Sequence, residues 1–195
     1  MFASRIGLSV VRQALRNNCE TASLSMLLAT TGRRVGQLRL QSEVARSGPL
    51  DPRGRGGDRI WGDPELGFVG RAEGGGAAGG FGVYQRPIRQ LAARYGRPVV
   101  DMTRRPRVAL VRRLLAGHAV LVWVGLSDGP YDSWRSPQGR RVTVNYGEHA
   151  VVLTGVHANG DLRVANPLHG TRERWSPAQF ARMWRRLGRR AASAT

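Results

Sequence analysis

The fold of this chain is organised around residues 13–26, which read Gln13-Ala-Leu-Arg-Asn-Asn-Cys19-Glu-Thr-Ala-Ser-Leu-Ser-Met26. A polar segment gives way at Cys19 to a helix-prone run whose apolar residues recur on one helical face. Gly32 is placed to end this helix in a left-handed conformation. Cys19 would then lie in the first turn, where free N–H groups and the helix dipole favour an anion. We expect its thiol to ionise more readily than the reference pKa of about 8.5, which makes Cys19 a candidate nucleophile.

Cys19 is the only cysteine of the chain. A lone cysteine is also an ordinary small apolar core residue, so this stretch alone leaves both interpretations open. One cysteine excludes an internal disulfide and a cysteine-based zinc site. We predict no metal and no cofactor.

The charge of the chain is strongly positive, at +18, with 31 basic residues that are all arginine and 13 acidic residues. Such an excess is compatible with a polyanionic partner. The arginines are spread over predicted helices, loops and strand ends, without a basic tract interleaved with aromatic residues. We therefore expect no specific nucleic-acid partner, although attraction to polyanions at low salt follows from the charge.

Size and hydropathy predict a globular protein. With 195 residues and 41% apolar residues, the chain suits a single domain over residues 1–195. The longest apolar run, Ala119 to Leu126, is too short to span a membrane. The N-terminus lacks the features of an export signal, which as written predicts a cytoplasmic protein. A location in the cell envelope or outside the cell stays open if an upstream segment is missing. The oligomeric state stays open as well.

Hydrophobic periodicity predicts helices before a mostly antiparallel sheet, which is an α+β arrangement. Residues 47–80 are rich in Gly and Arg and predict a long flexible loop, and the basic residues 189–195 predict a frayed tail. Residues 127–139 read as a polar loop. Helices are expected from Cys19 towards Gly32, at 35–45, at 87–95, at 106–116 and after Ser176-Pro177; strands are expected at 99–102, 118–126, 142–146, 149–156, 162–165 and 172–175.

The long loop carries two large aromatic residues, Trp61 and Phe68. They either contact a substrate groove or attach the loop to the core, and attachment is the favoured interpretation. Both stay, together with Glu148, as candidate substrate contacts. The tract Gly74 to Gly80 suggests phosphate binding only weakly, because no strand precedes it and no Lys-Ser/Thr ending follows it.

A nucleophilic cysteine needs a general base and a residue that orients this base. Among the four histidines, His149 begins a predicted strand, where its side chain can face a cleft. Asn166 ends the neighbouring antiparallel strand and offers an oxygen for the imidazole N–H. A two-residue turn at Asn159-Gly160 would leave Asn166 about four positions, roughly 13 Å, from His149. The pair therefore predicts a longer loop or a bulge near Gly155.

Gln13 precedes Cys19 by six positions. Its carboxamide N–H, together with the backbone N–H of Cys19, could stabilise an oxyanion. A glutamine at this position would be unremarkable without Cys19.

Three blocks in order resemble a known family. Gln13-x5-Cys19-Glu-x-Ala-Ser-x-x-Met-x-Leu resembles the nucleophile segment of papain-like cysteine peptidases, in particular the bacterial group similar to family thirty-nine, the bacteriocin-processing enzymes that cut after double glycine. The middle block, Ile60-Trp-Gly-Asp-Pro-x-x-Gly-Phe-Val-Gly70 with Gly82-Val-Tyr-x-x-Pro-Ile88, is similar to the same group. So is the last block, Glu148-His-Ala-Val-Val-Leu-Thr-Gly155 with Val164-Ala-Asn-Pro167.

The resemblance implies a papain-like fold with N-terminal helices packed on the sheet. It also implies Cys19 as nucleophile, His149 as base, Asn166 as orienting residue and Gln13 in the oxyanion hole. The third position of this group is usually aspartate. Asn166 can orient the imidazole but adds no negative charge to hold an imidazolium.

The leading hypothesis is a thiol-dependent peptidase or amide hydrolase that acts on a peptide or protein substrate through an acyl-enzyme. A first alternative is a peptide-binding module on the same fold without turnover. A second alternative is an arginine-driven polyanion-binding protein.

Overall fold

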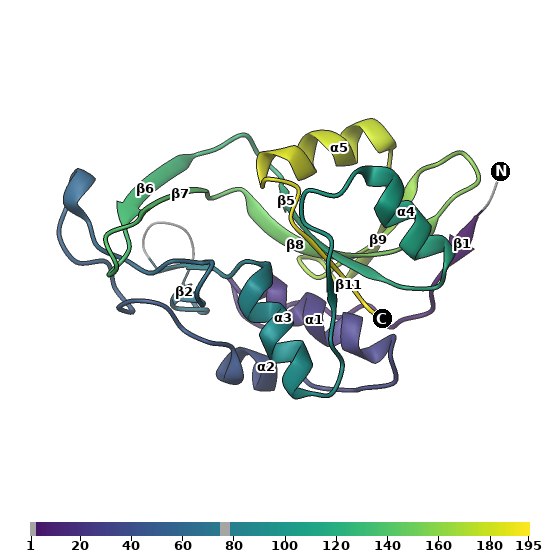
Figure 1. Cartoon of the computed structure of the whole chain (residues 1–195), viewed down its shortest axis with the longest axis horizontal. Helices are drawn as coiled ribbons and strands as arrows, with labels where there is room; N and C mark the ends of the chain where they lie inside the picture. The colour runs from purple at the N-terminus through teal and green to yellow at the C-terminus, as the bar shows by residue number, and fades with distance from the viewer. Residues whose placement is uncertain (1–2, 75–78) are drawn as a thin grey trace.

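The computed structural model describes residues 3–74 and 79–195 and arranges them in layers (Figure 1). A central sheet is covered on one face by α1, α2 and α3 and on the other by α4 and α5. The helices are α1 (Cys19–Ala29), α2 (Gln37–Glu43), α3 (Gln85–Arg94), α4 (Arg107–Leu115) and α5 (Pro177–Arg186), with a short 3-10 turn at Gly56–Asp58. No helix in these described ranges is long and apolar enough to cross a membrane.

The central sheet is antiparallel throughout, with strand order β10-β9-β8-β5-β11-β4 and β1 paired to β8. Its strands are β1 (Ser4–Arg5), β4 (Val100–Asp101), β5 (Val120–Gly125), β8 (Glu148–Val156), β9 (Leu162–Asn166), β10 (Thr171–Trp175) and β11 (Ala191–Ser193). Two small antiparallel pairs stand apart, namely β2 (Val69–Gly70) with β3 (Gly80–Gly82), and β6 (Tyr131–Arg135) with β7 (Arg141–Asn145). The predicted mixed fold with an antiparallel sheet is therefore confirmed.

Strand β8 separates two hydrophobic cores because its side chains alternate between the two faces of the sheet. Ala150 and Val152 pack in the cluster that also contains Cys19 and Trp123. Val151 and the following Leu153 pack on the other side, under α4 and α5. A continuous apolar run is expected for a strand that is buried on both faces.

Helix α1 is buried on nearly all sides, which is expected of a helix that lies between a sheet and other helices. The hydroxyl of Ser23 donates to the carbonyl oxygen of Ala150 at 3.0 Å and joins α1 directly to β8. After Ala29 the chain turns at Gly32, whose φ of +80° is the left-handed conformation expected there. The first helix thus ends as predicted, with its N-terminus against the start of β8.

The predicted irregularity near Gly155 is confirmed. The pairing of β8 with β9 shifts register between Leu153 and Gly155, and Gly155 has a φ of +153°. A Cβ at this position would lie 2.1 Å from the carbonyl oxygen of Ser4, in the adjacent strand β1. At this bulge β8 has one residue more than β9. The bulge therefore shifts Asn166 by one position towards the beginning of β8, where His149 lies.

Two predictions about loops and termini are wrong. Residues 189–195 are not a frayed tail, because β11 (Ala191–Ser193) lies buried between β5 and β4. Three small residues leave no periodic signal in the sequence, yet they fit between two flanking strands. The polar segment 127–139 contains β6, which is stabilised by pairing with β7.

The other predicted helices and strands are present with shifted ends, whereas no prediction covers the short strands β1, β2 and β3. The second helix is shorter than 35–45, and its Leu38 is 54% exposed while Leu40 is buried. In the long loop, Trp61 and Phe68 are fully buried. The ring of Trp61 packs on that of Trp134 with centroids 5.0 Å apart. Both aromatic residues thus attach the loop to the core. Part of the tract Gly74 to Gly80, residues 75–78, lies outside the described residues.

Candidate functional site

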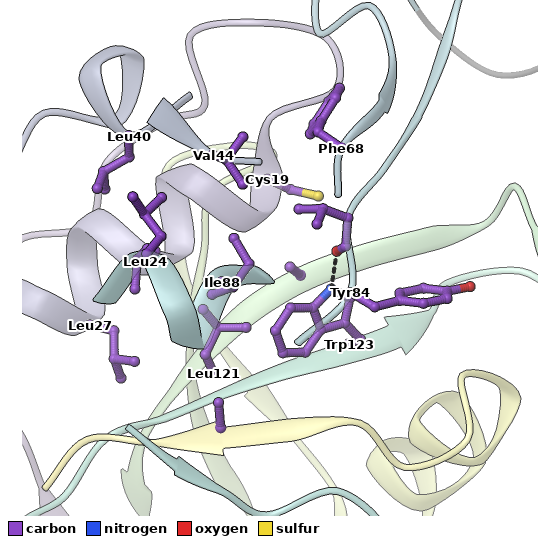
Figure 2. Packing of buried hydrophobic residues seen from close by; sticks show 14 of the residues in the cluster. Cys19, Leu24, Leu27, Leu40, Val44, Phe68, Tyr84, Ile88, Leu121 and Trp123 are labelled. Carbon is purple, nitrogen blue, oxygen red and sulfur yellow. Dashed lines mark hydrogen bonds between the residues drawn. The ribbon is translucent and has the colours of Figure 1, made fainter. Parts of the chain in front are cut away.

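Cys19 is the first residue of α1, as expected, but it is almost completely buried, with 3% of its surface exposed. Figure 2 shows it at the end of the helix beside the packed cluster that includes Phe68 and Trp123. Its Sγ donates to Glu20 Oε2 at 3.4 Å. The backbone N–H of Ala150 lies near enough to the sulfur to lower the pKa of the thiol. This N–H belongs to the peptide that links Ala150 to His149, so the thiol meets β8 next to the candidate base.

The expectation of an easily ionised thiol is wrong for this structure. Burial raises the pKa of Cys19 well above its usual value, and the nearby carboxylates of Glu20 and Glu148 raise it further. The N–H of Ala150 acts in the opposite direction. Desolvation and two like charges therefore outweigh the helix dipole, whose effect is modest by comparison.

Glu20 is a buried carboxylate at the N-terminus of α1. Its Oε1 accepts the backbone N–H of Val83 at 2.6 Å, and its own backbone N–H also acts on the carboxylate. Val83 is held in turn, because its carbonyl oxygen accepts from Trp123 Nε1 at 2.9 Å (Figure 2). Burial nevertheless raises the pKa of Glu20 to about 7.

Glu148, expected as a substrate contact, lies beside Cys19 and Glu20. One ligand atom from each of the three side chains lies within 4.8 Å of the others. Burial raises the pKa of Glu148 well above its usual value, and the charge of Glu20 adds to this effect, whereas Arg190 opposes it. A thiolate with two carboxylates is a donor set that Zn²⁺ accepts, but such an ion would occupy the sulfur and block it as a nucleophile.

His149 and Asn166 are brought together as predicted. His149 Nε2 and Asn166 Oδ1 are 2.7 Å apart, and both side chains are buried. Asn166 Oδ1 also accepts the backbone N–H of Leu168 at 2.9 Å, and Asn166 Nδ2 donates to Glu173 Oε1 at 2.7 Å. These two bonds fix the orientation of the amide, so that its oxygen faces the imidazole. Nε2 must then carry the proton, which leaves Nδ1 with a free lone pair.

The imidazole of His149 is neutral at pH 7. Burial lowers its pKa below the usual value, while the bond to Asn166 and the charge of Glu173 raise it. Glu173 therefore supplies, one hydrogen bond behind Asn166, the negative charge that asparagine lacks. The other carboxylate oxygen of Glu173 accepts from Trp175 Nε1 at 2.8 Å.

Gln13 differs from the expectation. Its carboxamide nitrogen donates to the carbonyl oxygens of Leu15 and Arg16, both at 2.9 Å. Both amide hydrogens are therefore used within the loop that enters α1, and the side chain presents no free N–H for an oxyanion. The backbone N–H of Gln13 donates to Pro167 at 2.8 Å and ties this loop to the segment after Asn166. Gln13 thus positions the loop in this structure.

Trp61 and Phe68, the other candidate substrate contacts, do not reach the surface. The prediction that they contact substrate is wrong for this structure, because a fully buried ring cannot touch a peptide in a groove. A cavity of about 640 Å³ is lined by residues such as Leu8, Met26 and Val35. Its lining comes from the segment before α1, from the last two turns of α1 and from the residues before α2, and does not include Cys19.

Sequence reasoning missed Glu20 and Glu173. Glu20 reads as an ordinary acidic residue in the first turn of a helix, where it complements the dipole. Glu173 lies in an edge strand and alternates with arginines, which is typical of a solvated face. Only the order of the strands places β10 beside β9 and brings Glu173 to Asn166.

Comparisons with known proteins agree with this architecture. The sequence model of the Peptidase_C39 like family matches residues 6–192. The chain is 33% identical over 181 residues to YvpB of Bacillus subtilis (strain 168), an uncharacterised protein, and the match covers 91% of this chain and 68% of YvpB. It is also similar to a crystal structure from Bacillus anthracis assigned as a C39-like peptidase, with a TM-score of 0.85 and 26% identity. That similarity covers 100% of this chain and 98% of the other.

Proposed function

The chain belongs to the Peptidase_C39 like family, and from this premise we propose that it is a thiol-dependent hydrolase of peptide or amide bonds. The observation that carries the proposal is the bond between His149 Nε2 and Asn166 Oδ1. It leaves the second ring nitrogen of His149 able to accept a proton, and the Ala150 N–H that acts on the Cys19 sulfur belongs to the next residue along β8. The substrate is a peptide or protein.

The reaction starts from a neutral thiol and a neutral imidazole, because the pKa of Cys19 is raised and that of His149 is lowered. His149 Nδ1 takes the thiol proton as the sulfur attacks the carbonyl carbon, and the carbonyl electron pair moves to oxygen. The backbone N–H of Cys19 at the N-terminus of α1 stabilises this oxyanion.

The tetrahedral intermediate then collapses. The C–N bond breaks, and the imidazolium of His149 gives its proton to the leaving amine. Water, deprotonated by the same imidazole, attacks the thioester, and the acid product leaves with the thiol restored. Asn166 keeps the ring in one tautomer throughout, and the carboxylate of Glu173 behind it offsets the transient positive charge on His149.

The test uses the single cysteine of the chain. Purified protein is incubated with a mixture of synthetic peptides, and new termini are identified by mass spectrometry. We expect cleavage that is lost in Cys19→Ala and in His149→Ala, and a thioester intermediate trapped on Cys19. The exposed-loop variant Asp58→Asn is the matched control and retains cleavage. Cleavage that survives in Cys19→Ala would exclude the proposed nucleophile.

A second candidate function is a peptide-binding module without turnover, which the burial and the raised pKa of Cys19 favour. It predicts that a thiol-alkylating reagent labels Cys19 no faster than a free thiol. It also predicts that Cys19→Ser binds peptides as tightly as the unmodified protein. Rapid, saturable labelling of Cys19 would exclude this candidate.

A further inference from the structure

The two carboxyl groups beside Cys19 approach each other over a glycine. A Cβ placed on Gly82 would lie 2.1 Å from Glu20 Oε1 and 3.6 Å from Glu148 Oε2. Glu20 comes from the first turn of α1 and Glu148 from the first residue of β8. The fold thus brings two acidic groups and a thiol to one point, in a chain whose net charge is +18.

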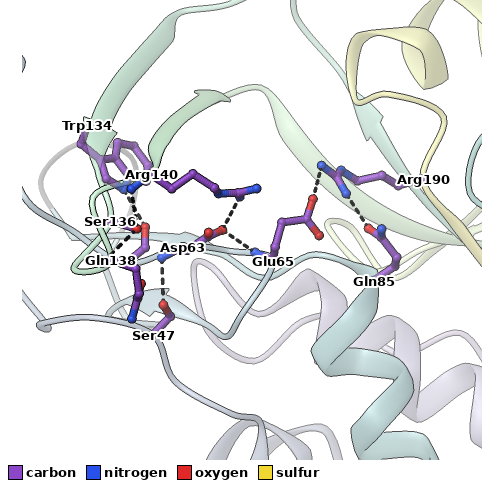
Figure 3. A network of polar contacts seen from close by, with 10 residues as sticks. Ser47, Asp63, Glu65, Gln85, Trp134, Ser136, Gln138, Arg140 and Arg190 are labelled. Carbon is purple, nitrogen blue, oxygen red and sulfur yellow. Dashed lines mark hydrogen bonds and ion pairs between the residues drawn. The ribbon is translucent and has the colours of Figure 1, made fainter.

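No free cation among the described residues balances this cluster. Arg190 is the basic group that acts on Glu148, but it is bonded to Glu65 Oε1 at 2.6 Å and to Gln85 Oε1 at 2.7 Å (Figure 3). Its guanidinium also lies 3.7 Å from the centre of the Tyr84 ring. Arg190 is therefore shared among several groups and cannot neutralise both carboxylates.

Glu148 has a further unmet requirement. Its Oε1 is buried and has no hydrogen-bond partner within the described part of the chain. A buried carboxylate without a partner is costly, and the usual outcome is that the group takes up a proton. Glu20 is better satisfied, because Val83 and Cys19 both donate to it.

We propose that Glu20 and Glu148 form a proton-holding pair that controls the Cys19 thiol: the pair keeps one proton at neutral pH, and its charge state sets how easily Cys19 loses its own. Both glutamates are positioning residues that act through the sulfur. The consequence for catalysis rests on the proposed role of Cys19 as nucleophile, whereas the protonation of the pair does not.

Several titratable and charged groups lie around the pair. Cys19 shares α1 with Glu20, Tyr84 precedes α3, and Arg190 precedes β11 and is paired with Glu65. His149 follows Glu148 in β8, but its ring is bonded to Asn166. The pKa values of both carboxyl groups are raised, mainly by burial, which agrees with a retained proton.

The chemical consequence follows from the order of proton loss. Each negative charge that develops on the pair raises the pKa of the Cys19 thiol. A pair that holds its proton therefore eases ionisation of the sulfur, and a fully charged pair opposes it. Because the groups are coupled, their titration curves belong to the cluster and shift together on substitution.

The first measurement detects the proton in the unmodified protein. The infrared band of a protonated carboxyl group is followed from acid to alkaline pH, and the spectrum of the Glu20→Gln/Glu148→Gln double variant is subtracted. We expect a band that persists to neutral pH, where exposed carboxyl groups are ionised. Absence of the band at neutral pH would overturn the proposal. This outcome is seen in the spectrum of the unmodified protein alone, so it does not depend on whether the double variant folds.

The second measurement follows the thiolate through its ultraviolet absorbance, with Cys19→Ala as the blank. In Glu148→Gln and in Glu20→Gln we expect the thiol to titrate about one pH unit lower, as is typical when a neighbouring like charge is removed. Glu43→Gln, at the end of α2 and bonded to Tyr95 and Arg39 rather than to the pair, leaves the titration unchanged. An unshifted titration in both variants would refute control of Cys19 by the pair.

These outcomes are separable from the proposed function. If Cys19→Ala still cleaved peptides, the hydrolase mechanism would fail while the infrared band remained. If the band were absent while Cys19→Ala abolished cleavage, only the proton-holding pair would fail.

Discussion

Asn166 donates its amide N–H to Glu173 Oε1 at 2.7 Å, on the side of the amide away from His149. The family usually has an aspartate in the place of Asn166, as the third residue after the cysteine and the histidine. In this chain a neutral amide connects the imidazole to a carboxylate in the next strand. The negative charge is therefore carried by Glu173, which lies one residue further from the His149 imidazole. In the proposed mechanism, Asn166 orients the ring and Glu173 provides the electrostatic stabilisation that the amide cannot.

Glu173→Gln is expected to lower the pKa of His149, because the charge of Glu173 raises it. The substitution keeps an oxygen for the Asn166 amide, so the ring stays in place and the effect is electrostatic. Ring chemical shifts of His149 measured by NMR across a pH series give the result. Asp161→Asn, which removes a half-buried carboxylate that is paired with Arg174, is the matched control. An unchanged His149 titration would show that Glu173 has no electrostatic role.

Asn166→Asp is expected to destabilise the protein although it restores the usual residue of the family. The new carboxylate would lose the N–H that Glu173 accepts and would face Glu173 as a like charge. We expect a loss of about 1–3 kcal/mol in the free energy of unfolding, measured in urea. Asn166→Asp combined with Glu173→Gln should recover much of the loss. Equal stability of the single and double variants would contradict this explanation.

Gly155→Ala should disturb the site from a distance. The φ of +153° strains any side chain there, and the added Cβ would lie 2.1 Å from the carbonyl oxygen of Ser4. We expect a loss of about 1–3 kcal/mol together with altered His149 ring shifts, because the bulge sets the register that brings Asn166 to His149. Gly36→Ala, where an added Cβ meets nothing within 4 Å, is the control. Unchanged His149 shifts in Gly155→Ala would argue against this role of the bulge.

The stability of the protein should fall as the pH rises through neutrality. The pKa of Glu20 is raised to about 7 and that of Glu148 is also raised, so the folded state binds more protons than the unfolded chain. The contribution of these two carboxyl groups to the free energy of unfolding is complete below their ordinary pKa, near 4.5. It is lost as the pH rises through their pKa values in the folded state. Thermal unfolding detects it, since 1 kcal/mol moves the Tm of a chain of this size by about 2–4 °C. The Glu20→Gln/Glu148→Gln variant should have a flatter pH profile than Glu43→Gln.

Removal of residues 189–195 should unfold or strongly destabilise the protein. Strand β11 is buried and pairs with both β5 and β4, and Trp184 Nε1 donates to the carbonyl oxygen of Arg190 at 2.9 Å. Circular dichroism during heating measures the effect. The matched control is substitution of Thr195, an exposed terminal residue, by Ala. A truncated chain that unfolds at the same temperature as the full chain would contradict the role of β11.

Local patterns in the sequence were sufficient for most elements. The apolar periodicity of residues 87–95, and that of the residues after the Ser176 cap with Pro177, predicted α3 and α5, because a helix is specified by neighbours three and four residues apart. The same holds for the apolar runs of β5 and β8. The spacing of His149 and Asn166 even required an irregularity near Gly155, since strand geometry limits which residues can face each other.

The tertiary structure decided the rest, because burial and electrostatics depend on residues that are distant in the chain. The ionisation of Cys19 was mispredicted from its helix end, since that expectation could not include Glu148, which arrives from β8. The role of Glu173 depends on the strand order that places β10 beside β9. The burial of β11 depends on two strands that leave room for small side chains between them. Local sequence specifies which segments are helices and strands, whereas the charge environment of each side chain is set only when those segments pack.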